Sequence, residues 1–189
     1  MRHCIAAMFV VVISITLCAG SAAAQQHITV DFTTGQLWHQ HGDGQSDVYQ
    51  VVLPKTTAQA TMRVAQRPVI GQFDRADYKP TWGPTPNMRR RDPSLPAVVR
   101  YGHPRHALGI YRLRIAWQNS GNHEFWRYVR IHGGAKEEDL NQAKSSGCIR
   151  MLNPDIQRLV ANIQAAQAAG ETEVIVVFVH LSAENLPTS

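Results

Sequence analysis

The sequence predicts a mainly β domain with β-sandwich-like mixed sheets and one principal α-helix. Three observations support this prediction. Short apolar or alternating segments recur along the chain, turn-forming residues separate them, and one segment alone has a clear helical period. The chain has 189 residues, of which 44% are hydrophobic and 17% charged. This composition excludes wholesale disorder, and the length suits a single domain.

The N-terminal segment is expected to be removed during export. Arg2 precedes an apolar run over residues 5–17, and small residues at 22–24 offer an A-x-A cleavage site. This is the pattern of a secretory signal peptide over residues 1–24. The apolar run is short of the ~20 residues that span a membrane, so a membrane anchor is the weaker alternative. We expect no integral membrane segment after processing.

The cysteine count changes with processing. Residues 25–189, the predicted mature domain, retain Cys148 and lose Cys4 and Cys18. Lipidation of Cys18 is disfavoured by the bulky residue before it. Exported proteins usually pair their cysteines, and an unpaired thiol is open to oxidation. By count alone, Cys148 is either a functional thiol or an inert buried one.

The strands are expected in chain order. The first segments read as consecutive hairpins, because alternating residues are interrupted by Thr-Gly and Gly-Asp-Gly turns. The last is almost wholly apolar, as in a strand covered on both faces. Strands are predicted over 28–32, 36–39, 49–53, 110–117, 125–131 and 173–181, with turns at 34–35, 42–44 and 120–122.

The principal helix is predicted to begin near Asn153 as N-cap and to end near Gly170. Pro154 suits the first helical position. Apolar residues at 156, 159, 160 and 163 give the helix one buried face. Two segments read as irregular. Residues 66–78 have no clear period, and residues 79–96 contain five prolines and predict a long surface loop.

Chemistry-bearing residues concentrate in residues 131–153. His132 ends a predicted strand before two glycines, and Cys148 lies in a turn of small residues. A thiol attacks as the thiolate, and a neighbouring imidazole can take its proton and return it to the leaving group. Backbone N–H groups at 146–148 would form an oxyanion hole. Arg150 would hold a carboxylate or lower the thiol pKa.

Other candidates have plain alternatives. A metal site of His103 and His106 with His132 and Cys148 is disfavoured, because the H-x-x-H pair is not in a helix. The Arg89–Arg91 run is either an anion contact or a solvated loop, and no nucleic-acid motif accompanies it. Three tryptophans in predicted strands are expected to be core or interface residues: Trp38, Trp117 and Trp126. Four histidines are expected to be ordinary surface or strand-end residues: His39, His41, His123 and His180.

These motifs resemble those of the YkuD-type L,D-transpeptidases of bacterial cell-wall synthesis. That family has a His-Gly, a long gap, and then [ST]-His-Gly-Cys followed by an apolar residue, Arg and an apolar residue. This chain has His132-Gly133 and, at the matching spacing, Ser-Ser-Gly-Cys-Ile-Arg-Met over 145–151. Further resemblances lie at 28–49, 79–86, 95–99 and 107–111, so nearly the whole mature chain is covered.

The resemblance implies the L,D-transpeptidase catalytic domain fold and acyl transfer on peptidoglycan stem peptides, in the periplasm or at the cell wall. Cys148 would be the nucleophile, His132 the general base and acid, and the Gly133 carbonyl would orient His132. Ser146 and Gly147 would supply oxyanion N–H groups. Substrate would be bound by Arg150, Ser145 and Trp82, the last being either a stacking residue or a loop anchor.

The implied reaction begins with attack of Cys148 on the diaminopimelate–D-Ala bond of a tetrapeptide stem. An amine of a second stem or of an anchored protein would resolve the thioester, whereas water would make the enzyme an L,D-carboxypeptidase. The resemblance implies no cofactor, no metal, and inhibition by carbapenem-type β-lactams, and an exported chain is expected to have no nucleic-acid partner. Ser146 replaces the family's usual His, so a non-catalytic peptidoglycan-binding module is one alternative. A general Cys–His endopeptidase acting on proteins is another, and the order and spacing of the motifs disfavour it.

Overall fold

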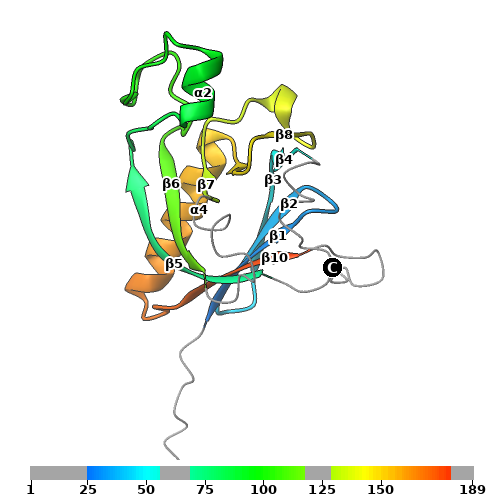
Figure 1. Ribbon diagram of the computed structural model, residues 1–189. Coiled ribbons are helices and arrows are strands. Elements are labelled where there is room, and N and C mark those ends of the chain that lie inside the picture. The colour runs from blue at the N-terminus through cyan, green and yellow to red at the C-terminus, as the bar shows by residue number, and fades with distance from the viewer. Residues whose placement is uncertain (1–24, 56–68, 118–128, 180–189) are drawn as a thin grey trace, which may run out of the picture.

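The computed structural model describes residues 25–55, 69–117 and 129–179 (Figure 1). Mainly β structure with one long helix confirms the predicted class. The elements are β1 (Gln26–Asp31), β2 (Gln36–Gln40), β3 (Ser46–Gln50), β4 (Leu53–Pro54), β5 (Val69–Tyr78), α2 (Pro86–Arg91), β6 (Tyr111–Trp117), β7 (Ile131–His132), η1 (Glu137–Asp139), β8 (Ala143–Ser145), β9 (Ile149–Arg150), α4 (Asn153–Ala168) and β10 (Val174–Val179).

The main sheet is mixed and curls until its two edges meet. Its strand order is β3-β2-β1-β10-β5-β6-β7-β9, and β4 and β8 form a separate two-stranded sheet. The pairs β1–β10 and β7–β9 are parallel, whereas the other pairs in the main sheet are antiparallel. Val52, which follows edge strand β3, donates to the Arg150 carbonyl at 2.8 Å and accepts from its N–H at 3.1 Å. This bridge joins the β3 end of the sheet to β9.

Helix α4 supplies the second layer of the core, beside β6 in Figure 1. Its four buried side chains have the predicted helical spacing and join those of the strands in one hydrophobic cluster: Ile156, Leu159, Val160 and Ile163. Burial of each such side chain contributes about 1.5–3 kcal/mol to folding. The amphipathic pattern therefore places the helix on the sheet, as the sequence predicted.

The start of α4 differs from the prediction. Leu152 occupies the N-cap position without a side-chain hydrogen bond, and Asn153 is already helical. The Asn153 side chain is instead used by two loops, because its Oδ1 accepts from the N–H of Ile110 and of Gly134, each at 3.1 Å. The helix ends where predicted, with Gly170 at φ +102° just beyond it.

Strand β5 was missed by the sequence prediction, which treated residues 66–78 as irregular. Its register shifts between Phe73 and Arg75, so the side-chain alternation breaks in mid-strand. Pairing with β10 on one side and β6 on the other nevertheless stabilises it. The strand predicted over 49–53 was also displaced, since β3 ends at Gln50 and β4 starts at Leu53.

Two further expectations change. Strand β10 alternates buried and half-buried side chains, so one face is less covered than predicted. The loop over 79–96 contains the short helix α2, whose N-cap Thr85 Oγ1 accepts from the N–H of Met88 at 3.3 Å.

Within the described ranges, no helix is both long and apolar enough to cross a bilayer. The predicted signal peptide, the hairpin at 120–122, most of strand 125–131, His123, Trp126 and His180 lie outside the described residues.

Candidate active site

A cavity of about 440 Å³ lies between the turn before β9, the end of β7 and the loop that carries α2. Seven of the eight predicted site residues line it, and Gly133 does not: Cys148, His132, Ser145, Ser146, Gly147, Arg150 and Trp82. Residues from other elements complete the lining, among them Met88, Leu108, Arg112 and Arg130.

The pairing of β7 with β9 brings His132 and Cys148 into the lining of the same cavity. His132 is in register with Arg150, and the N–H of Ile149 donates to the Arg130 carbonyl at 2.9 Å. Because alternate residues of a strand share a face, Cys148 precedes Arg150 on the same side of the sheet as His132. Residues far apart in sequence thus become neighbours through two short strands.

His132 is held as a neutral imidazole. It is 4% exposed, and its Nδ1 donates to the Gly133 carbonyl at 2.7 Å. This bond leaves the lone pair on Nε2. Burial lowers the pKa of His132 to about 4, opposed by the Gly133 hydrogen bond and reinforced by the charges of Arg150 and Arg112. At neutral pH the ring can therefore accept a proton.

Cys148 is half-buried, and burial raises the pKa of its thiol. The backbone N–H of Arg130 and the charges of Arg130 and Arg150 act in the opposite direction. The net result is a thiol that is protonated at neutral pH. Attack by this sulfur therefore requires a base to remove the proton as the reaction proceeds.

The turn that carries Cys148 is shaped by Ser145. The buried Ser145 hydroxyl donates to the Cys148 carbonyl and accepts from the Gly147 N–H at 3.1 Å. Gly147 has a φ of +147°, a region that L-residues rarely adopt. The Ser145 hydroxyl is thus engaged within the turn, and the Gly147 N–H would have to leave Ser145 to bind an oxyanion. The Ser146 residue is exposed at the cavity.

Three guanidinium groups converge on the cavity, and two of them were missed by sequence reasoning. Arg150 is half-buried, and its Nε has no hydrogen-bond partner among the described residues. Arg130 donates from Nη1 to the Val129 carbonyl at 2.7 Å. Arg112 faces His132 in the β6–β7 register. The alternation of β6, with Leu113 buried and Arg112 at the cavity, is the signal that would have found it.

Arg112 is oriented by Asp77 on β5. Its Nη2 and Nε donate to Asp77 Oδ2 at 2.6 and 3.0 Å, and Arg114 Nε donates to the same oxygen at 2.8 Å. Partial burial raises the pKa of Asp77, but the hydrogen bonds and charges of Arg114 and Arg112 lower it to about 2. The carboxylate stays ionised and fixes Arg112 at the cavity wall.

The loop that carries Trp82 and α2 is held in place by backbone hydrogen bonds. Trp82 and Val99 exchange two hydrogen bonds of 2.8 and 2.7 Å, and the half-buried Trp82 lines the cavity. His106 Nε2 donates to the Pro80 carbonyl at 2.7 Å, and His103 Nδ1 accepts from Arg105 at 3.1 Å. Both histidines of the H-x-x-H pair therefore make hydrogen bonds to groups of this loop.

Tight backbone packing fixes the turn after His132. Gly109 and Gly134 have φ values of +64° and +79°. A Cβ at Gly109 would lie 2.2 Å from the Gly134 nitrogen and 2.3 Å from Asn153 Oδ1, which leaves no room for a side chain. Asn153 thus holds the segment before β6 against the segment after β7.

Comparisons with known proteins match this arrangement. A family model for the L,D-transpeptidase catalytic domain (YkuD) covers residues 25–176. The "Probable L,D-transpeptidase ErfK/SrfK" of Escherichia coli (strain K12) is 35% identical over 105 residues, which are 53% of this chain and 30% of the relative. The protein of the same name from Salmonella typhimurium is 32% identical over 116 residues, 59% of this chain and 34% of the relative.

Both curated relatives are longer, since the matched segment spans about a third of their length. A solved structure described as the "Ldtfm-avibactam carbamoyl enzyme" matches 84% of this chain and 50% of its own, with a TM-score of 0.52 and 15% identity. At that identity the likeness concerns the fold. The family model accounts for most of the chain, and the chain therefore belongs to the L,D-transpeptidase catalytic domain (YkuD) family.

Proposed function

We propose that this chain is an exported L,D-transpeptidase that acts on peptidoglycan tetrapeptide stems through Cys148. The observation that carries the proposal is the presence in one cavity of Cys148 and of the neutral His132 ring, which Gly133 orients. A neutral imidazole and a protonated thiol that line the same cavity are the starting state that general-base activation requires. Family membership supports the same chemistry.

The first half-reaction forms a thioester and releases D-alanine. His132 Nε2 takes the thiol proton as Cys148 Sγ bonds to the carbonyl carbon at the L-centre of diaminopimelate. The tetrahedral intermediate collapses as the carbon–nitrogen bond breaks, and His132 gives the proton to the leaving amine. Backbone N–H groups of the 146–148 turn would stabilise the oxyanion, with Gly147 freed from Ser145. Gly133 fixes the tautomer that makes both transfers feasible.

The second half-reaction transfers the acyl group. An acceptor amine loses a proton to His132 and attacks the thioester carbon, and the sulfur leaves as the thiol after proton return. A diaminopimelate amine would give a 3→3 cross-link, and a lysine would anchor a protein. Water in place of the amine would make the enzyme an L,D-carboxypeptidase. In each case the acyl-enzyme is the same.

The cavity supports recognition of an anionic peptide. Arg112, Arg130 and Arg150 all line it, and the stem carries carboxylates at diaminopimelate and at its terminal D-alanine. Arg150 Nε is a donor without a partner among the described residues, so a substrate carboxylate would satisfy it. Trp82 and Met88 would contact the apolar parts of the stem from the loop side.

The decisive experiment incubates the chain with tetrapeptide muropeptides and analyses the products by mass spectrometry. Loss of D-alanine with a new cross-link is expected, and loss without a cross-link would indicate the carboxypeptidase. Cys148→Ser and His132→Gln are the matched variants, and both should be inactive. A product profile identical for wild type and Cys148→Ser would overturn the proposal and favour a non-catalytic binding module.

Inhibitor trapping tests the nucleophile directly. Incubation with a carbapenem should add one inhibitor mass to the wild type and none to Cys148→Ser. Avibactam is a second probe, because a protein of this fold is described as its carbamoyl enzyme. A mass adduct that maps to another residue would assign the nucleophile elsewhere.

The cellular location is tested separately by fractionation, which should recover the processed chain from the periplasm or the cell wall.

A further inference from the structure

His39 contradicts the expectation of an ordinary surface or strand-end histidine. It lies on β2 and is 0% exposed. His41 lies two residues on, just beyond the end of β2, and Asp47 on β3 is the direct partner of His39 in the antiparallel register. Residues two apart on a strand share a face, and directly opposed residues are cross-strand neighbours. The hairpin therefore gathers two imidazoles and a carboxylate.

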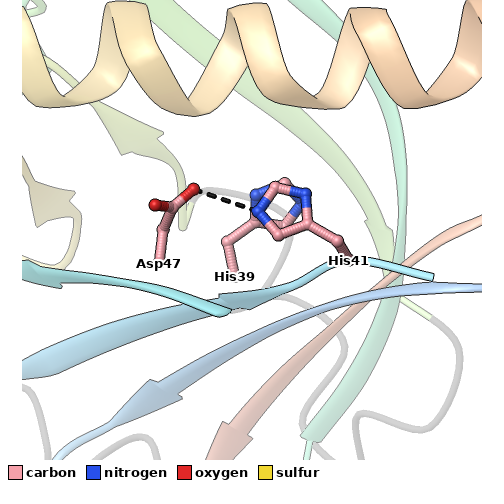
Figure 2. A group of neighbouring side chains, drawn as sticks. All are labelled: His39, His41 and Asp47. Atoms are coloured by element: carbon pink, nitrogen blue, oxygen red, sulfur yellow. Dashed lines mark hydrogen bonds and ion pairs between the residues drawn. The ribbon is translucent and has the colours of Figure 1, made fainter. Parts of the chain in front are cut away.

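The three side chains are close enough to share one ion. One nitrogen or oxygen atom from each lies within 4.8 Å of the others. Figure 2 shows them grouped above the β2–β3 hairpin, with Asp47 joined to a ring nitrogen of His41. That contact, between His41 Nε2 and Asp47 Oδ2, is 3.0 Å long. The His39 and His41 ring centroids lie 4.4 Å apart.

His39 carries an unsatisfied acceptor inside the protein. Gln26 donates from its amide nitrogen to the Glu171 carbonyl at 3.3 Å, so its Oε1 faces His39 Nε2 at 2.8 Å and accepts the proton there. The lone pair is then on Nδ1, which is buried without a hydrogen-bond partner in the described ranges. A buried polar atom left unpaired destabilises a protein by about 1–3 kcal/mol. A bound ion or an ordered water would satisfy this atom.

The hydrogen bond between Gln26 and the His39 ring also suits a metal ligand. A neutral imidazole whose second nitrogen is hydrogen-bonded by an amide is the usual form of a histidine ligand. Gln26 would thus fix the ring orientation, as partners behind metal ligands do.

We infer that His39, His41 and Asp47 form a zinc site in the β2–β3 hairpin. Two imidazoles and one carboxylate are a ligand set suited to Zn²⁺, with water as the fourth ligand of a tetrahedral centre. The His41 and Asp47 side chains are 21% and 33% exposed, so the ion can enter from solvent. Asn162 on α4 donates to Asp47 Oδ2 at 2.6 Å and would hold the carboxylate in place.

The site is independent of the proposed catalysis. None of its ligands lines the cavity of Cys148 and His132. Asp47 accepts a hydrogen bond from Asn162 of α4, so a bound ion would stabilise the contact between the β2–β3 edge of the sheet and the helix. An ion that binds only the folded state raises the unfolding temperature by mass action.

The test uses the processed chain, residues 25–189, with Cys148→Ala, which removes the one thiol in that range as a competing zinc ligand. After chelation, calorimetric titration with Zn²⁺ alone should give one ion per chain and a raised unfolding temperature. His41→Ala and Asp47→Asn, both at half-exposed positions, should each weaken zinc binding at least ~100-fold, since loss of a supporting partner alone costs 10–100-fold. His103→Ala is the matched control and should bind zinc as its parent does.

Cobalt(II) supplies a readout of the ligand set. The Cys148→Ala chain should show the ligand-field bands of four-coordinate Co²⁺, and Asp47→Asn should lose them while circular dichroism confirms an intact fold. Absence of stoichiometric zinc binding would overturn the inference. So would equal zinc affinity in the parent, His41→Ala and Asp47→Asn chains.

Discussion

The Oδ1 atom of Asn153 accepts the backbone N–H of Gly134 at 3.1 Å, two residues beyond the candidate base His132. The same oxygen accepts the N–H of Ile110 at 3.1 Å. One side chain at the start of α4 therefore fixes the loop before β6 and the turn after β7. We therefore expect Asn153 to help fix the Gly133 carbonyl, which accepts from His132 Nδ1.

Asn153→Ala should lower both stability and turnover. Two half-buried N–H groups lose their acceptor, which should decrease the free energy of unfolding by about 1–3 kcal/mol. The His132 turn should also loosen, and kcat should fall more than KM rises. Asn153→Asp retains an acceptor oxygen and should recover most of the stability. Equal unfolding midpoints in urea for wild type and Asn153→Ala would contradict this reading.

Gly147→Ala should impair the nucleophile turn without unfolding the protein. At φ +147° a Cβ is strained by about 1–3 kcal/mol, and relief of that strain would move Cys148. Activity on muropeptides should fall at least ~100-fold, because small misplacements of reacting groups have effects of that size. Gly44→Ala is the control, since Gly44 has φ +86° in an open turn away from the cavity. That variant should lose some stability and keep its activity.

The sequence predicted best those features that depend on neighbouring residues. The apolar period of α4 and the turns at 34–35 and 42–44 are local patterns, and the structure has them. Strand β5 was missed because a bulge between Phe73 and Arg75 breaks its alternation, and its stability comes from two partner strands. Asn153 was taken for a cap because its acceptor suits that role, whereas the tertiary structure uses it between loops.

The same distinction applies to the site. Cys148, Ser145, Gly147 and Arg150 belong to one short motif, so sequence alone could group them. Arg112 and Arg130 come to the cavity through the pairing of β6, β7 and β9. The alternation of β6 places Arg112 on the face opposite the buried Leu113, but only the strand pairing brings that face to the cavity. The burial of His39 likewise depends on a sheet and a helix that pack over it.

Arg150→Met should separate substrate binding from stability. The side chain supplies charge to the cavity, and its Nε has no partner among the described residues, so removal breaks no such bond. Loss of a charge-assisted hydrogen bond of about 1.5–3 kcal/mol should lower kcat/KM ~10–100-fold, mainly through KM. The unfolding free energy should stay equal or rise. Arg114→Met, which removes a partner of Asp77 outside the cavity lining, should leave KM unchanged.

Ser146→His should raise or broaden transpeptidation. The residue is exposed at the cavity, so an imidazole would add a donor beside the reacting carbonyl with a stability change within ~0.5 kcal/mol. Initial rates with a panel of acceptor amines would measure the effect, with Ser146→Ala as the control for loss of the hydroxyl. Unchanged rates in Ser146→His would mean that Ser146 already suffices for this step.

The buried His132 should make the protein less stable in mild acid. Its pKa is about 4 in the folded state and 6.5 in the unfolded chain. Above pH 6.5 the ring is neutral in both states. Between pH 6.5 and 4 only the unfolded chain takes up the proton, so the free energy of unfolding falls as pH falls, by about 3 kcal/mol in total from this residue. Below pH 4 both states are protonated and this contribution stays lost.

His132→Gln removes that titration while the other groups of the chain remain. Urea unfolding of both proteins at several pH values should show that the stability advantage of the wild type shrinks by about 3 kcal/mol between pH 7 and pH 4. The direction of this stability change follows from burial, which favours the neutral His132 ring in the folded state. A difference that is constant over this range would mean that His132 titrates alike in the folded and unfolded chains. A difference that grows toward acid pH would mean that the folded protein prefers the imidazolium.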